Sequence, residues 1–173
     1  MDIYTIIVML HVIGTILGAG GATLAELNIA TALRDGKVGD EERALMHANY
    51  TLIRVGMAIL FVSIIAMLWY HLSQGNMFII TSEKLWAKYL MFGAIIVNAV
   101  ALSRRWVPLW LGASISFTSW WGATLLGLAG RLPYSIEMYL VGYVIAIFVG
   151  AGILHMTRKA IIARRFSGLF SLR

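Results

Sequence analysis

His11 lies inside the first hydrophobic segment of the chain and is followed by a run of glycines. At about 100° per residue, Gly14, Gly18 and Gly21 all fall within about 80° of His11 on one helix face. An ionisable ring in an apolar segment is costly to bury, and such residues commonly mark functional sites. A face without side chains beside an imidazole suits a flat macrocycle or a closely packed neighbouring helix. We therefore expect the chemistry of this protein near that face.

Lys88 is a second ionisable group inside an apolar segment. It lies about five residues, or about 8 Å, from the start of the segment at 1.5 Å per residue. From that depth a lysine stem can extend to the membrane surface. Alternatively, its ammonium faces the region of His11, where it would pair with an anionic group or orient an anionic substrate. His11 and Lys88 are thus each candidate functional residues.

The other three histidines are candidate metal ligands, since neutral imidazole is a common ligand of haem iron. His71 ends the second apolar segment and is the candidate partner of His11 for bis-histidine ligation, although it is expected nearer the membrane surface. His47 and His155 fall at the opposite membrane boundary. They are either interfacial hydrogen-bonding residues or ligands of a second metal site. Trp120 and Trp121 are expected deeper than the interfacial tryptophans, where they would wall a cofactor pocket, and Trp121 is the candidate cofactor-binding residue of the two.

Two further pairs of side chains in the apolar segments are expected to have mainly structural roles. Glu26 and Arg54 are expected to pair, because an unpaired charge in a membrane is costly. Met57 and Met67 are either packing residues or axial ligands.

The composition is that of an integral membrane protein. The chain is 60% hydrophobic and 13% charged, with a mean hydropathy of +0.83. A soluble domain carries about 25% charged residues. The chain has no cysteine, which excludes disulfides, thiolate metal sites and cysteine nucleophiles.

An apolar segment of about 20 residues can cross a bilayer as a helix. The sequence predicts an all-α bundle of five such spans in one domain, residues 1–173, with spans near 3–33, 48–74, 83–103, 108–130 and 134–157. Residues 73–76 and 104–108 are expected turns, and Asp40 is the expected N-cap of a second helix that starts early. The first segment lacks a basic start and is expected to be a span rather than a signal peptide.

Basic residues predict the orientation of the chain. With the N-terminus outside, three basic residues lie outside, namely Lys84, Lys88 and Arg131. Eleven lie inside: Arg34, Lys37, Arg43, Arg54, Arg104, Arg105, Arg158, Lys159, Arg164, Arg165 and Arg173. This bias follows the positive-inside rule and places the C-terminus inside. The net charge of +6 is thereby attributed to topology and contact with anionic lipid, so we expect no nucleic-acid partner.

Three motifs within residues 5–104 resemble a superfamily of small polytopic bacterial membrane proteins. The motifs are His11 followed ten residues later by Gly21, the run Glu42-Arg43-Ala44-Leu45-Met46 before an apolar helix, and Leu85-Trp86-Ala87-Lys88. The superfamily includes the HemJ-type protoporphyrinogen oxidases, the copper-resistance protein D family and related domains of unknown function. The resemblance to the HemJ-type enzymes implies bound haem b and a functional pair at His11 and Lys88.

We therefore expect a haem b protein of the bacterial inner membrane that acts in electron transfer or a porphyrin-linked redox step. HemJ-like oxidoreductase activity, a quinone as electron partner and a homo-oligomer are all compatible with the sequence. A second interpretation is a copper or small-solute transport protein in which His11 and Lys88 line the pathway. A third is a structural membrane subunit without a cofactor.

Overall fold

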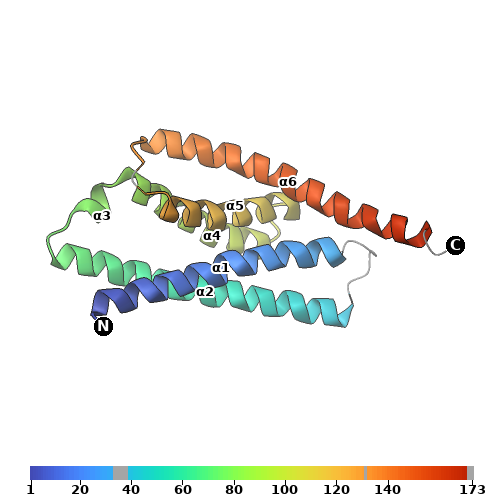
Figure 1. Cartoon of the computed structure of the whole chain (residues 1–173), viewed down its shortest axis with the longest axis horizontal. Helices are drawn as coiled ribbons and strands as arrows, with labels where there is room; N and C mark the ends of the chain where they lie inside the picture. The colour runs from blue at the N-terminus through green and yellow to red at the C-terminus, as the bar shows by residue number, and fades with distance from the viewer. Residues whose placement is uncertain (33–38, 131, 171–173) are drawn as a thin grey trace.

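The structure is a computed structural model that describes residues 1–32, 39–130 and 132–170, with side chains described to residue 161. Every secondary-structure element in these ranges is a helix (Figure 1). Five helices are long, and α3 is a single short turn. Their bounds are α1 Ile3–Ala32, α2 Asp40–Ser73, α3 Phe78–Thr81, α4 Glu83–Ser103, α5 Leu109–Leu128 and α6 Ile136–Phe170.

Within the described residues, four helices are long and apolar enough to cross a membrane: α1, α2, α4 and α6. Exposed residues such as Trp69, Phe148 and Met156 give these helices an apolar outer surface. The chain is therefore an all-helical protein with the features of an integral membrane protein. The fifth long helix, α5, does not reach the same hydropathy. Its serines, threonines, tryptophans and glycines lower the value, and Ser114, Thr118 and Ser119 are buried.

The first two helices form an antiparallel pair in close contact. A Cβ on Gly14 would lie 2.9 Å from the backbone nitrogen of Leu60, and a Cβ on Gly56 would lie 2.7 Å from that of Gly18. The absence of side chains at these three glycines lets the two backbones touch, as in glycine-mediated packing of membrane helices. The same register places Tyr4 on Tyr70, with ring centroids 4.8 Å apart.

An ion pair ties α1 to α6. Arg158 Nη2 donates a hydrogen bond of 2.6 Å to Glu26 Oε2, and both side chains are largely buried. The expected pairing of Glu26 with Arg54 is therefore wrong. Arg54 instead stacks on Tyr50 and donates to its hydroxyl at 3.1 Å. The sequence contained no distance information that could have identified the sixth helix as the source of the cation.

Helix α5 occupies the interior of the bundle, where it contacts α1, α4 and α6. In Figure 1, α4 and α5 lie between the α1–α2 pair and α6. Hydroxyls of α5 bond to α6, since Ser114 Oγ donates to the carbonyl of Ile147 at 2.5 Å and Ser119 Oγ lies 2.6 Å from the Tyr143 hydroxyl. The hydroxyls of Ser114 and Ser119 thus have hydrogen-bond partners inside the protein, whereas Trp120 Nε1 is buried without one among the described residues.

In the part of the chain that the structure describes, α2 and α4 make no close backbone contact. Two cavities lie along this gap, and both are lined by α1, α2, α4 and α5. Side chains bridge the gap between the cavities, where the rings of Phe61 and Phe92 stack with centroids 6.5 Å apart.

The helix ends follow the predicted turns with small differences. Gly39, not Asp40, is the N-cap of α2, and its amide donates to Glu42 Oε2 at 3.0 Å. The turn at 73–76 is confirmed, and Gly75 adopts the positive φ of 69° that favours glycine. Of the basic residues that predict orientation, Arg34, Lys37, Arg131 and Arg173 lie outside the described residues, as do the side chains of Arg164 and Arg165.

Candidate functional site

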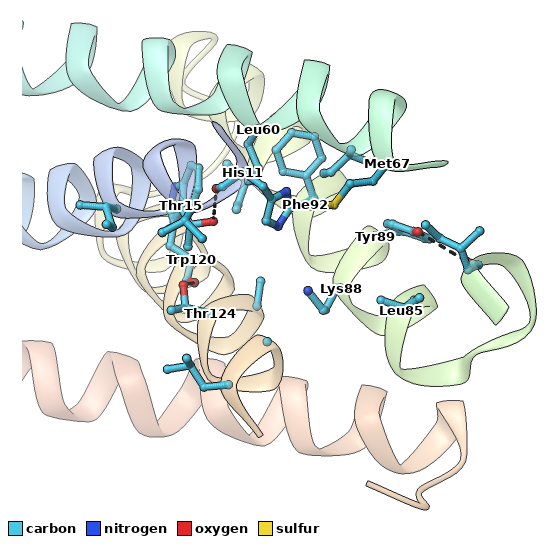
Figure 2. A pocket seen from close by; sticks show the side chains of 18 residues that line it. His11, Thr15, Leu60, Met67, Leu85, Lys88, Tyr89, Phe92, Trp120 and Thr124 are labelled. Carbon is cyan, nitrogen blue, oxygen red and sulfur yellow. Dashed lines mark hydrogen bonds between the residues drawn. The ribbon is translucent and has the colours of Figure 1, made fainter. Parts of the chain in front are cut away.

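His11 and Lys88 line one cavity of about 440 Å³, here called the His11 cavity. Figure 2 shows the imidazole from α1 and the ammonium from α4 projecting into the same space. The other polar groups of the lining are Thr15, Tyr89, Trp120 and Thr124, and the apolar lining includes Leu60, Ile64, Met67, Leu85, Phe92 and Ile95. The lining contains no carboxylate. The two residues singled out by sequence therefore meet, although 77 positions separate them.

A serine on α2 holds the His11 ring in place. Ser63 Oγ lies 3.1 Å from His11 Nδ1 and 2.8 Å from the carbonyl oxygen of Leu60. When Ser63 donates its only hydroxyl hydrogen to Leu60, it accepts from His11, and the proton of the neutral ring is on Nδ1. The lone pair is then on Nε2, which has no hydrogen-bond partner among the described residues. This arrangement prepares Nε2 to bind a metal or to accept a proton.

Lys88 differs from Lys84, which lies one turn earlier on α4. The ammonium of Lys84 donates to the carbonyls of Ala129 and Gly130 and so caps the end of α5. The ammonium of Lys88 lies beside Gly127, and no described carboxylate pairs with it. A partly buried cation without a counter-charge favours an anionic ligand group in the cavity.

Trp120, rather than Trp121, walls the His11 cavity. Its side chain is only 1% exposed, and its ring occupies the position that a Cβ on Gly18 would need. Trp121 faces the other side of α5, is 38% exposed and donates to Thr23 Oγ1 at 3.0 Å. The two neighbours point about 100° apart on the helix, so only one of them can face the interior.

The glycine face of α1 is in contact with protein. Gly14 meets the α2 backbone, Gly18 meets Trp120, and a Cβ on Gly21 would lie 2.7 Å from Ile53 Cγ1. Of the two interpretations of this face, the structure displays the packed neighbouring helix. Helix packing also brings Ser63 within reach of His11, because it fixes the register of α1 against α2.

His71 lies apart from the His11 cavity. One ring nitrogen is 3.2 Å from the Tyr4 hydroxyl, and the other is 3.2 Å from Asn76 Nδ2. His71 is not among the residues that line the cavity. Both of its nitrogens have local partners at the end of α2, so the structure does not bring it to His11 as a second ligand.

His47 and His155 are both exposed, on α2 and α6 respectively. Within the described residues there is no group of three or more histidine, aspartate or glutamate side chains that could hold a metal ion. A second metal site at these two histidines therefore has no additional ligands of those types in the described chain.

Comparisons with known proteins do not assign the chain to a family: no family model, no curated protein and no solved structure matches it. The resemblance to the HemJ-type superfamily thus depends on the three sequence motifs alone.

The residues of the His11 cavity fit a haem held by one histidine. Nε2 of His11 is the available ligand, and its orientation is held through Nδ1, as is usual for metal-bound imidazoles. Lys88 would pair with a propionate, and the volume falls in the usual range of about 300–1,000 Å³ for ligand sites. Met67 lines the same cavity, whereas His71 does not, so Met67 is the other side chain there that could hold the iron.

Sequence reasoning missed Ser63 beside this cavity and Arg158 in the ion pair at the other end of α1. Ser63 appears in the sequence as one serine in an apolar helix, and only the α1–α2 register reveals its bond to His11. Trp120 was expected beside Trp121 at a cofactor pocket, but the sequence did not reveal which of the two lines the cavity. Arg158 appeared to be part of the basic cluster at the C-terminal end of the chain, yet it is the partner of Glu26. Helical spacing could have suggested a common face for Trp120 and Thr124, which lie one turn apart.

Proposed function

We propose that this protein binds haem b in the His11 cavity and acts in electron transfer or in a porphyrin-linked redox step in the bacterial inner membrane. The observation that carries the proposal is the placement of the His11 ring. Ser63 Oγ lies 3.1 Å from Nδ1, Nε2 has no hydrogen-bond partner among the described residues, and Lys88, with which no described carboxylate pairs, lines the same cavity. Together these groups match a metalloporphyrin that needs one axial nitrogen and carries carboxylates.

Each protein group has a definite task in this proposal. His11 Nε2 would hold the iron, and Ser63 would keep the ring in the productive orientation. Lys88 would bind a propionate through a charge-assisted hydrogen bond. Phe92 and Trp120 would contact the ring faces or edges and exclude water. The haem would supply one-electron redox chemistry, with the potential tuned by burial and by the axial ligands.

The visible spectrum of the purified protein tests this proposal. Detergent-purified protein from haem-supplemented cells should display a sharp Soret band, and reduction with dithionite should sharpen the α and β bands of a b-type haem. A folded but colourless protein would contradict the proposal and would favour transport or a structural role.

Copper transport is less well supported by the cavity. Copper(I) prefers thiolate, thioether and imidazole ligands. A pathway for a metal cation also needs lining groups that stabilise positive charge, such as carboxylates. The lining offers one imidazole and one thioether, Met67, together with the cation of Lys88 and no carboxylate. The ammonium would oppose the passage of a metal cation.

We also propose that α5 is a fifth span, with the N-terminus outside and the C-terminus inside. Its 20 residues would extend about 30 Å, which is the thickness of the bilayer core. The basic residues support the orientation through the positive-inside rule. A C-terminal alkaline phosphatase fusion should be inactive, since that enzyme needs export. An active fusion would reverse the orientation.

A further inference from the structure

The second cavity in the gap between α2 and α4 is here called the Arg54 cavity, and it has a volume of about 560 Å³. Its walls are mainly apolar and include Ile53, Met57, Ile95 and Phe117. It lies toward the Asp40 end of α2, on the side of the Phe61–Phe92 pair opposite His11. The haem proposal does not use this cavity.

Arg54 brings a positive charge to this cavity that no described carboxylate balances. Glu26 also lines the cavity, but its carboxylate is paired with Arg158 at 2.6 Å. Arg54 lies over the Tyr50 ring, 4.2 Å from the centroid, and donates one N–H to the Tyr50 hydroxyl. Arginine has five N–H donors, so most remain available for an anionic oxygen. The cavity is therefore suited to an anion attached to an apolar body.

Asn98 supplies a complementary polar atom. Its side chain is only 5% exposed, and its Nδ2 donates to the carbonyl of Gly112 at 2.7 Å. That bond fixes the orientation of the amide and leaves Oδ1 buried, without a hydrogen-bond partner among the described residues. A buried acceptor without a donor is costly, and a ligand hydroxyl would remove that cost.

We propose that the Arg54 cavity binds an anionic phospholipid with a hydroxylated headgroup, of the phosphatidylglycerol class. The phosphate accepts hydrogen bonds from Arg54, a glycerol hydroxyl donates to Asn98 Oδ1, and an acyl chain lies against the apolar wall. Basic sites between membrane helices are typical binding places for such headgroups. The gap between α2 and α4 gives the lipid a lateral entry, since Ile96, Val100 and Leu109 on its border are exposed.

Native mass spectrometry of the full chain in detergent tests the proposal with two lipids of equal acyl chains, phosphatidylglycerol and phosphatidylcholine. Wild type should bind phosphatidylglycerol more tightly. Arg54→Gln should weaken that binding about tenfold, as expected when a charge-assisted hydrogen bond is lost. Arg104→Gln is the matched control, because Arg104 is exposed at the end of α4 and lies outside the cavity lining. Equal binding of both lipids by wild type, or no change in Arg54→Gln, would overturn the proposal.

Binding of two further amphiphiles identifies the kind of molecule that the cavity prefers. Phosphatidylmethanol has the same charge but no hydroxyl, so it should bind more weakly than phosphatidylglycerol, and equal binding would remove the role of Asn98. Oleate tests for a carboxylate amphiphile, and tighter binding of oleate than of either phospholipid would overturn the phospholipid assignment. If Arg54→Gln fails to fold, folded Arg54→Lys replaces it and should retain the preference over phosphatidylcholine, and loss of that preference would overturn the proposal. The wild-type comparison of the two lipids decides the proposal without either variant.

Discussion

The His11 cavity and the Arg54 cavity are built from the same four helices, yet their polar groups differ in kind. Both are mainly apolar, both lie in the gap between α2 and α4, and Ile95 contributes to both. The His11 cavity combines a free imidazole lone pair with an ammonium. The Arg54 cavity combines a guanidinium with a buried amide oxygen. The same four helices thus line two cavities, and a few polar side chains determine which ligand groups each cavity can bind.

The difference indicates how ligand type is selected in such a bundle. Apolar walls accept any amphiphile of suitable size, because the hydrophobic effect is not directional. Discrimination comes from the few polar atoms that would be left unpaired by the wrong ligand. A nitrogen lone pair selects a metal or a proton, whereas guanidinium donors select an oxyanion. Substitutions at these atoms should therefore affect one cavity and leave the other unchanged.

The largest effect is expected from His11→Ala, which removes the proposed iron ligand. The variant should lose most of its haem, measured as haem per polypeptide from the reduced pyridine adduct. His71→Ala should keep its haem, since His71 bonds to Tyr4 and Asn76 away from the cavity. Unchanged lipid binding by His11→Ala would confirm that the two cavities are separate. Full haem content in His11→Ala would transfer the ligand role to another histidine.

Ser63→Ala should have the next largest effect. Loss of an outer partner of a metal-bound histidine typically costs about 10- to 100-fold in affinity. The variant removes the acceptor that holds the Nδ1–H of His11, so haem should dissociate faster into an excess of apomyoglobin. Ser63→Thr keeps the hydroxyl and is the matched control. Equal dissociation rates in wild type and Ser63→Ala would exclude Ser63 as the residue that positions His11.

Lys88→Met should weaken haem retention about tenfold, as expected for one lost hydrogen bond to a charged group. Methionine keeps an apolar stem and removes only the ammonium. Lys84→Met is the control on the same helix, because Lys84 caps α5 instead of facing the cavity. Haem titration of the apoprotein measures both variants. Identical affinities for wild type and Lys88→Met would show that the ammonium extends away from the ligand.

The smallest effect is expected from Gly18→Ala. The new methyl group would collide with the Trp120 ring, which can move toward the cavity it lines. Overpacking of a buried side chain costs about 1–3 kcal/mol of stability. The thermal unfolding midpoint should therefore fall, and haem retention should fall a few-fold. Gly20→Ala is the control, since no atom lies within 4 Å of a Cβ there. A midpoint at or above that of wild type in Gly18→Ala would contradict the contact.

The sequence by itself determined the class of structure and the position of its apolar helices. Long hydrophobic segments form helices in lipid because each backbone group must find its partner within the segment. That requirement made α1, α2, α4 and α6 predictable from composition and length. It also marked His11 and Lys88, because ionisable groups are conspicuous in an apolar segment.

Tertiary structure alone decided which of these groups meet. Glu26 pairs with Arg158 instead of Arg54, Trp120 faces the cavity instead of Trp121, and His71 lies apart from His11. Each outcome depends on the rotation and register of one helix against another, and for α1 and α2 the register is set by close packing at Gly14 and Gly56. Helical periodicity specifies a face but not its neighbour, because packing energy depends on the shape of two surfaces together.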